Sequence, residues 1–163
     1  MQLILISRCL LGETVRYDGG NKRLQHPLLE LWQRQHRLVP ICPEMVGGLP
    51  CPRPAAEIIG GDGQAVLSGQ TQVLHQDGSS ASDAFIRGAQ AALELCQQRQ
   101  IRFALLKARS PSCGIHGSYD GSFENRISDQ GIGVTAALLR QHGIQLFDET
   151  QLDDLAIALS SDI

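Results

Sequence analysis

Short apolar runs that alternate with segments of helical spacing are the feature that most constrains how this chain folds. The runs occupy residues 2–7, 37–41, 101–106 and 144–147. Continuous apolar runs of this length are typical of strands buried on both faces of a sheet. Helical spacing predicts helices over residues 24–36, from 80 or 82 to 99, over 135–141 and over 150–159. Because strands alternating with helices form parallel sheets with right-handed crossovers, we predict a single-domain, three-layer, Rossmann-like α/β fold with a mostly parallel sheet.

Two segments lie outside this alternation. Residues 43–54 are rich in proline and glycine, which predicts a long rigid loop. Residues 55–76 contain apolar segments on either side of a glycine-rich turn at 60–63, which predicts a small hairpin arm with strand residues at 56–59, 65–67 and 71–74. Either Ser80 or Ser82 is expected to cap the helix that follows.

Length and charge favour one small-molecule-binding domain. The 163 residues, of which 42% are hydrophobic, are enough for one sizeable core, so residues 1–163 are read as a single domain. Lysine and arginine number 14 and aspartate and glutamate 17, a formal charge of −3, so no basic field favours long nucleic acid. We therefore expect a small-molecule substrate and a monomer or homodimer.

The protein is expected to be cytoplasmic. No apolar run approaches the roughly 20 residues that span a bilayer, and the first residues lack a basic leader with a small-residue cleavage site. The five cysteines are an odd number without the spacing of a secreted disulfide framework. Reduced thiols, available for metal binding or catalysis, are therefore expected.

Three cysteines follow three of the predicted strands. Cys9 and Cys42 come directly after the first two apolar runs, and Cys113 follows the third after a short loop. The carboxyl ends of parallel strands meet at one edge of a sheet, where such folds bind ligands, so these three thiols are expected to lie together. Cys96 falls on the apolar stripe of a helix and is expected to be structural. Cys51 lies in the same loop as Cys42 and is either a substitute ligand or a spectator.

Three thiolates suit two kinds of metal site. One is a zinc ion completed by water, and the other is an iron–sulfur cluster with one iron not held by cysteine. Basic residues near the same edge would lower the thiol pKa values and offset an anionic site. They are Arg8, Arg16, Arg53, Lys107 and Arg109.

Glu44 is the candidate base. It lies two residues after Cys42, where partial desolvation would raise its pKa toward a useful range. The alternative is a carboxylate that only pairs with Arg53 or accepts loop amide bonds.

Several other polar residues belong to the same predicted edge. Ser110 and Ser112 flank Pro111, so one hydroxyl can face a ligand while the other caps local backbone. Ser7 and Asp18 are placed there too. His116 is the histidine closest in sequence to Cys113, and the turn at residues 131–133 is a weak candidate for phosphate binding.

Three motifs, in order, resemble one known family. They are Ser7-Arg8-Cys9-Leu10-Leu11-Gly12, Pro40-Ile41-Cys42-Pro43-Glu44, and Ser110-Pro111-Ser112-Cys113-Gly114. Together with Pro52-Arg53-Pro54 and residues 133–139, they resemble the thiouracil desulfurase family, formerly a domain of unknown function. The resemblance spans nearly the whole chain. Cys51 stands at a position that carries no cysteine in the family pattern.

The resemblance implies a [4Fe–4S] cluster held by Cys9, Cys42 and Cys113, with the fourth iron free to take the substrate sulfur. It also implies that Glu44 activates a water and that Ser110 either relays a proton or orients the ring. The implied reaction converts a thiolated pyrimidine (thiouracil, thiouridine or its nucleotide) to the oxygenated base, with release of hydrosulfide.

Two other functions use the same thiols. One is a zinc-binding structural or regulatory module without turnover, in which Cys51 or His116 closes the fourth position. The other is a metal-free enzyme in which one thiolate attacks the substrate.

Overall fold

A parallel sheet of four strands forms the centre of the computed structural model, which describes residues 1–124, 126–128 and 131–161. The strand order is β2-β1-β5-β8, and each neighbouring pair is parallel. The strands are β1 (Ile4–Ser7), β2 (Leu38–Ile41), β5 (Phe103–Leu106) and β8 (Gln145–Asp148). Each apolar run of the sequence thus overlaps a strand, although β8 ends one residue beyond its run, and the predicted α/β class and parallel sheet are confirmed.

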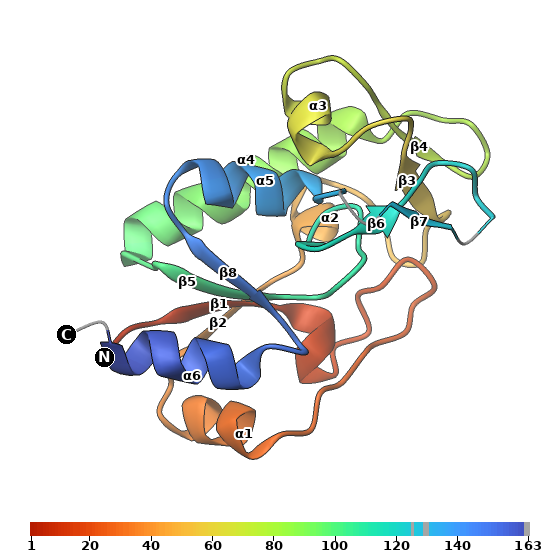
Figure 1. Ribbon diagram of the computed structural model, residues 1–163. Coiled ribbons are helices and arrows are strands. Elements are labelled where there is room, and N and C mark those ends of the chain that lie inside the picture. Colours follow the sequence, from red (N-terminus) through yellow and green to blue (C-terminus); the bar gives the residue numbers. More distant parts are fainter. Residues whose placement is uncertain (125, 129–130, 162–163) are drawn as a thin grey trace.

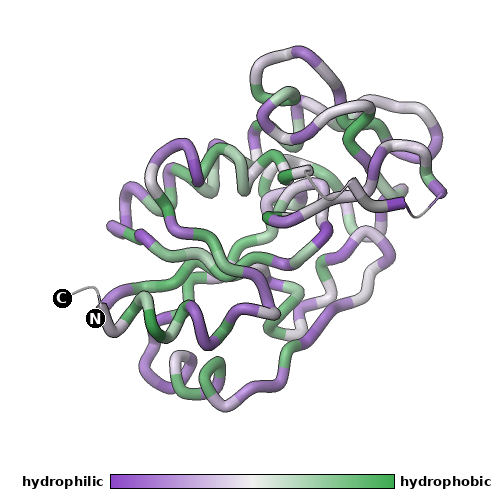
Figure 2. Tube along the Cα trace, in the orientation of Figure 1, coloured by the Kyte–Doolittle hydropathy of each residue, from purple (hydrophilic) through white to green (hydrophobic). Residues whose placement is uncertain are grey.

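Helices cover both faces of this sheet (Figure 1). On one face lie α1 (Pro27–Arg34) and α6 (Leu152–Ser161); on the other lie α4 (Ser82–Arg99) and α5 (Val134–Gln141). Figure 2 shows largely apolar stretches along the central strands. The side chains divide accordingly, since Ile4 and Ile6 of β1 pack with α1 and α6, whereas Leu5 packs with α4 and α5.

The arm is only partly the predicted hairpin. Strands β3 (Ala56–Ile58) and β4 (Val73–His75) pair in antiparallel fashion, as expected. Residues 65–67, however, belong to a short helix, α3 (Gly63–Leu67), and not to a strand. Asp62 causes the difference, because its carboxylate accepts a hydrogen bond from the Ala65 N–H at 3.0 Å and so caps the helix.

Other element boundaries also differ from the predictions. The predicted loop at 43–54 begins with a helical turn, α2 (Pro43–Val46), in which Pro43 occupies the first position. Helix α1 begins at Pro27 and not at residue 24, and Ala81 occupies the N-cap position of α4 instead of either serine. A further pair of short strands, β6 (Ser118–Tyr119) and β7 (Ile127–Ser128), was not predicted. In the described part of the chain, no helix is long and apolar enough to cross a membrane.

Candidate active site

The ends of three neighbouring strands place three thiols on one cavity. Cys9 lies in a short 3₁₀ helix, η1 (Arg8–Leu11), that directly follows β1, and Cys42 directly follows β2. Cys113 lies in the loop after β5. All three line a cavity of about 320 Å³. Since β2, β1 and β5 are adjacent in the sheet, the expectation that these thiols gather at one edge agrees with the structure.

Burial favours the protonated form of these three thiols when no metal is bound to them. It raises the pKa of Cys9 to about 11 and that of Cys113 to about 12, and it also raises the pKa of Cys42. The thiols act on one another as well: Cys9 and Cys42 each raise the pKa of Cys113. Lys107 and Arg16 act in the opposite direction on Cys9. A bound metal would displace these protons, because a coordinating thiol is deprotonated outright.

Helix α2 holds Cys42 and Glu44 in a defined place. Cys42 is its N-cap residue, and Glu44 lies in its first turn. The helix packs closely on α4, where a Cβ added to Gly88 would lie 2.0 Å from the Pro43 carbonyl oxygen. Such contact requires glycine at position 88, so the packing of α2 on α4 positions this part of the cavity wall.

Glu44 pairs with Arg53 and also lines the cavity. The Arg53 Nε donates to the Glu44 Oε1 at 3.2 Å, and the Arg53 side chain is only 3% exposed. The Arg53 Nη1 donates to the carbonyl oxygens of Val15 and Pro50. Desolvation raises the pKa of Glu44, and the charge of Arg53 lowers it. Pairing and a place in the cavity, treated as alternatives above, therefore occur together.

Ser110 and Ser112 have different surroundings. Ser110 lines the cavity, and its Oγ accepts hydrogen bonds from the Ser112 and Cys113 N–H groups, each at 3.1 Å. Ser112 is buried, with its hydroxyl 2.9 Å from the Thr135 hydroxyl. Ser110 therefore combines both roles that sequence reasoning had divided between the two serines. Ser112, which was placed at the edge, faces the core.

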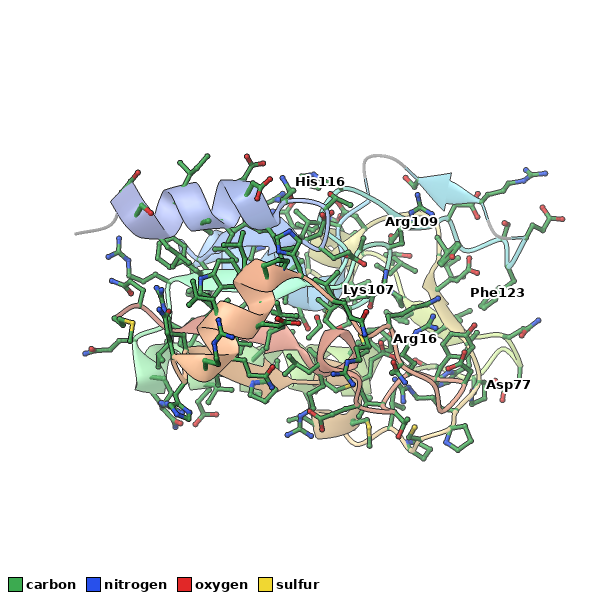
Figure 3. All side chains as sticks on the ribbon, turned by 90° about the horizontal axis from the view of Figure 1, so that it is seen from below. Arg16, Asp77, Lys107, Arg109, His116 and Phe123 are labelled. Atoms are coloured by element: carbon green, nitrogen blue, oxygen red, sulfur yellow. The ribbon has the colours of Figure 1, made fainter. Side chains whose placement is uncertain are left out.

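The basic residues expected near the thiols all line the cavity. They are Arg8, Arg16, Arg53, Lys107 and Arg109. Lys22, which was not predicted, lines the cavity as well. Figure 3 shows Arg16, Lys107 and Arg109 on one side of the molecule. The Lys107 Nζ lies 2.8 Å from the Glu149 Oε2, and its backbone N–H donates to the Ser7 hydroxyl at 3.0 Å. Ser7 also lines the cavity, as predicted.

Other candidate residues lie apart from the cavity. His116 is exposed and bonds Gln151 at the start of α6 (Figure 3). The Cys51 thiol donates to the carbonyl oxygens of Thr14 and Arg16. Cys96 is in the core, as expected. Among the described residues, no group of three or more His, Cys, Asp or Glu side chains is arranged to hold a single metal ion.

One expectation about the edge is wrong, and one weak candidate site is an ordinary turn. Asp18 does not line the cavity but accepts the Gly20 N–H and pairs with Arg16. The weak candidate for phosphate binding at 131–133 is an ordinary turn, because the N–H groups of Gly133, Val134 and Thr135 at the start of α5 already donate to carbonyl oxygens. Tertiary contacts of this loop therefore occupy the donors that a phosphate would need.

Sequence reasoning missed several residues that line the cavity. Glu57 of β3, Tyr119 of β6 and Tyr17 form part of the wall. None of them follows a strand of the main sheet, so the edge-of-sheet argument does not reach them. Both tyrosines of the chain are in this set, and that sparing use of tyrosine is the one signal the sequence offered.

A family model and a solved structure point to the same family. The family model described as 2-thiouracil desulfurase matches residues 4–151. An uncharacterized protein, YbbK of Bacillus subtilis (strain 168), is 35% identical over 153 residues, covering 94% of this chain and 99% of its own. A solved structure of the [4Fe-4S]-dependent thiouracil desulfidase TudS is 46% identical and superposes with a TM-score of 0.89, covering 98% of this chain and 99% of that one.

Proposed function

The chain belongs to the 2-thiouracil desulfurase family, and we propose that it is an iron–sulfur-dependent enzyme that removes sulfur from a thiolated pyrimidine. The observation that carries the proposal is that Cys9, Cys42 and Cys113, from three adjacent strand ends, line one cavity together with Glu44. The 46% identity to a [4Fe-4S]-dependent thiouracil desulfidase supports the same activity.

The residues present fit a [4Fe–4S] cluster held by Cys9, Cys42 and Cys113. Such a cluster binds each cysteine through a separate iron, so its ligands surround a cavity instead of converging on one point. All five cysteines are free, and the three proposed ligands are buried. Nearby positive charge from Lys107 and Arg16 favours the thiolate form of Cys9, which the cluster requires.

The zinc-module alternative has less support. The residues that were expected to close the fourth position of a zinc site, Cys51 and His116, do not line the cavity. The metal-free thiolate enzyme is also less favoured, because burial raises the pKa of all three cavity thiols. A nucleophilic cysteine needs the opposite shift.

When bound, the cluster supplies a Lewis-acidic iron that is not held by cysteine and can bind a thiocarbonyl sulfur. Glu44 acts as the general base in this proposal and takes a proton from the attacking water. Its Oε1 is held by the Arg53 Nε at 3.2 Å. Fixing one oxygen leaves the other to bind the water in a defined place.

Ser110 acts as a hydrogen-bond donor to the substrate. Its oxygen already accepts two backbone N–H groups, so its own hydrogen is directed away from them. The net reaction exchanges the thiocarbonyl sulfur for the oxygen of water and releases hydrosulfide and a proton. No electrons are transferred, so no external reductant is needed. We place this chemistry in the cytoplasm, where free thiols stay reduced.

Anaerobic reconstitution with iron and sulfide tests the proposal. The reconstituted protein is assayed for hydrosulfide release from 2-thiouracil, 4-thiouracil, the thiouridines and their nucleotides. Iron-dependent release supports the proposal and identifies the substrate among these forms. A protein that retains zinc, assembles no cluster and releases no sulfide would instead support the structural module.

A further inference from the structure

A single carboxylate joins two parts of the cavity wall that lie far apart in the sequence. Glu57 of β3 is buried, and its Oε1 accepts hydrogen bonds from the N–H groups of Gly121 at 2.9 Å and Phe123 at 3.3 Å. Both donors belong to the turn that connects β6 to β7. Figure 1 shows β3 beside these two strands. Glu57 therefore holds the β6–β7 turn against the arm.

The turn also packs closely on β3 at Gly121. A Cβ at this position would lie 2.7 Å from the Ile58 carbonyl oxygen, and the backbone there has φ +95°. Both conditions favour glycine. Backbone packing at Gly121 thus makes the contact with β3, and the Glu57 carboxylate adds hydrogen bonds to it.

Tyr119 lies between two contacts that hold residues 118–121 in place. On one side Ser118 forms a parallel bridge with Arg109, which precedes Ser110 in the cavity wall. On the other side the Gly121 N–H is bound by Glu57. Tyr119 itself lines the cavity. Its place in the wall therefore depends on the Glu57 tether.

The other tyrosine is less suited to contact a flat ring. Tyr17 also lines the cavity, but the guanidinium of Arg16 lies over its ring, 5.6 Å from the centroid. Tyr17 is 40% exposed as well. One face of that ring is therefore already occupied, which leaves Tyr119 as the aromatic surface available to a planar heterocycle.

We propose that Tyr119 stacks on the pyrimidine ring of the substrate and that Glu57 is a positioning residue that holds Tyr119 in place for this contact. The inference rests on the proposed function, since it assigns the ring-binding surface of that same site. Base–aromatic stacking is worth ~1–3 kcal/mol, so loss of the contact is expected to weaken binding about 5- to 150-fold.

A double-mutant cycle on the iron-loaded protein tests the inference. The variants are Tyr119→Leu, Glu57→Ala and the double variant, and the readouts are KM and kcat for the thiopyrimidine and the Kd of uracil by calorimetry. Each single variant is expected to raise KM and the uracil Kd with a smaller change in kcat. The double variant is expected to match Tyr119→Leu, because Glu57 acts through that ring.

Three controls separate positioning from general damage. Asp62→Ala removes another acceptor of a backbone N–H in the same arm, outside the cavity, and is expected to leave KM and Kd unchanged. Tyr119→Phe keeps the ring and is expected to recover most of the affinity that Tyr119→Leu loses. Glu57→Gln keeps an oxygen that can accept the N–H groups and is expected to recover most of the affinity.

The outcomes distinguish this inference from the proposed function. Additive effects of the two substitutions, or normal uracil binding by Tyr119→Leu, would overturn the inference. The proposed function would still stand if the wild-type protein releases hydrosulfide. A wild-type protein that neither releases sulfide nor binds uracil would overturn both.

Discussion

At the scale of single residues, three thiols with similar burial are assigned one shared role, while two other cysteines are not. Cys9, Cys42 and Cys113 line the cavity, Cys96 packs in the core, and Cys51 bonds backbone carbonyls outside it. Residue type alone does not separate these groups. What separates them is the surface on which each sulfur lies.

Substitution of a proposed ligand should prevent cluster assembly. Cys9→Ala, Cys42→Ala and Cys113→Ala are each expected to abolish stable iron binding after anaerobic reconstitution, because two thiolates cannot hold the cluster in place. Iron and sulfide per chain, with the visible spectrum, measure the effect. Cys51→Ala and Cys96→Ala are the matched controls and should bind iron normally. Normal iron content in any of the first three variants would contradict the ligand assignment.

Substitution of Glu44 should separate cluster binding from turnover. Glu44→Gln removes the proposed base but keeps an oxygen toward Arg53, so iron content is expected to stay normal. Hydrosulfide release should fall by about 10²- to 10⁴-fold, as for loss of a general base. The rate of hydrosulfide release from the thiopyrimidine in a single turnover measures this loss. Turnover at the wild-type rate would remove Glu44 from the mechanism.

At the scale of elements, the site depends on helices and turns that are too short to be stable alone. Helix α2 has four residues, and its position is set by packing on α4 through Gly88. Segment 14–17 is joined to the same region by Arg53, which donates to the Val15 carbonyl. The cavity wall is therefore made of short segments held by contacts with longer ones.

A substitution that pushes α2 away from α4 should disturb the site and also lower the stability of the protein. In Gly88→Ala the new Cβ would meet the Pro43 carbonyl, so α2 must shift, at an expected cost of about 1–3 kcal/mol in the free energy of unfolding. Because Cys42 precedes α2 and Glu44 lies in it, iron binding should weaken too. Denaturant unfolding and iron content measure both effects.

An exposed position on the same helix provides the control for this experiment. Gln90→Ala changes a solvent-facing residue of α4 and should alter neither stability nor iron content appreciably. A Gly88→Ala protein as stable and as rich in iron as this control would show that α2 adapts without moving Cys42.

At the scale of the whole molecule, the proposed cluster joins the ends of three strands. β2, β1 and β5 are neighbours in the sheet, and one thiol follows each. A group bound to all three thiols binds the native state and not the unfolded chain. Binding of this kind stabilises the fold by mass action.

Loss of iron should therefore lower the thermal stability of the entire protein. The iron-loaded protein is expected to unfold several degrees above the iron-free protein, and chelation under anaerobic conditions should remove the difference. Scanning calorimetry measures both forms. Cys113→Ala should show no rise on reconstitution, whereas Cys51→Ala should show the wild-type rise. Equal unfolding temperatures for both wild-type forms would contradict a cluster that bridges the strands.

Much of the architecture was predictable because local patterns carry it. Each buried strand is a continuous apolar run, and each main helix has an apolar stripe, so strand order along the chain and the parallel arrangement follow from general rules. Since parallel strands share a carboxyl edge, the gathering of Cys9, Cys42 and Cys113 followed from their positions after three strands. The family motifs pointed to the same residues.

Other features were decided only by the tertiary structure, because they depend on contacts between distant segments. Whether Ser110 or Ser112 faces the cavity depends on the Thr135 hydroxyl, which binds Ser112 in the core. The role of Glu57 depends on a turn more than sixty residues away in sequence. Residues 65–67 became helical because Asp62 caps them, although their composition also suits a strand. Local pattern thus determined the sheet and the thiol positions, whereas long-range hydrogen bonds and close packing determined the walls around them.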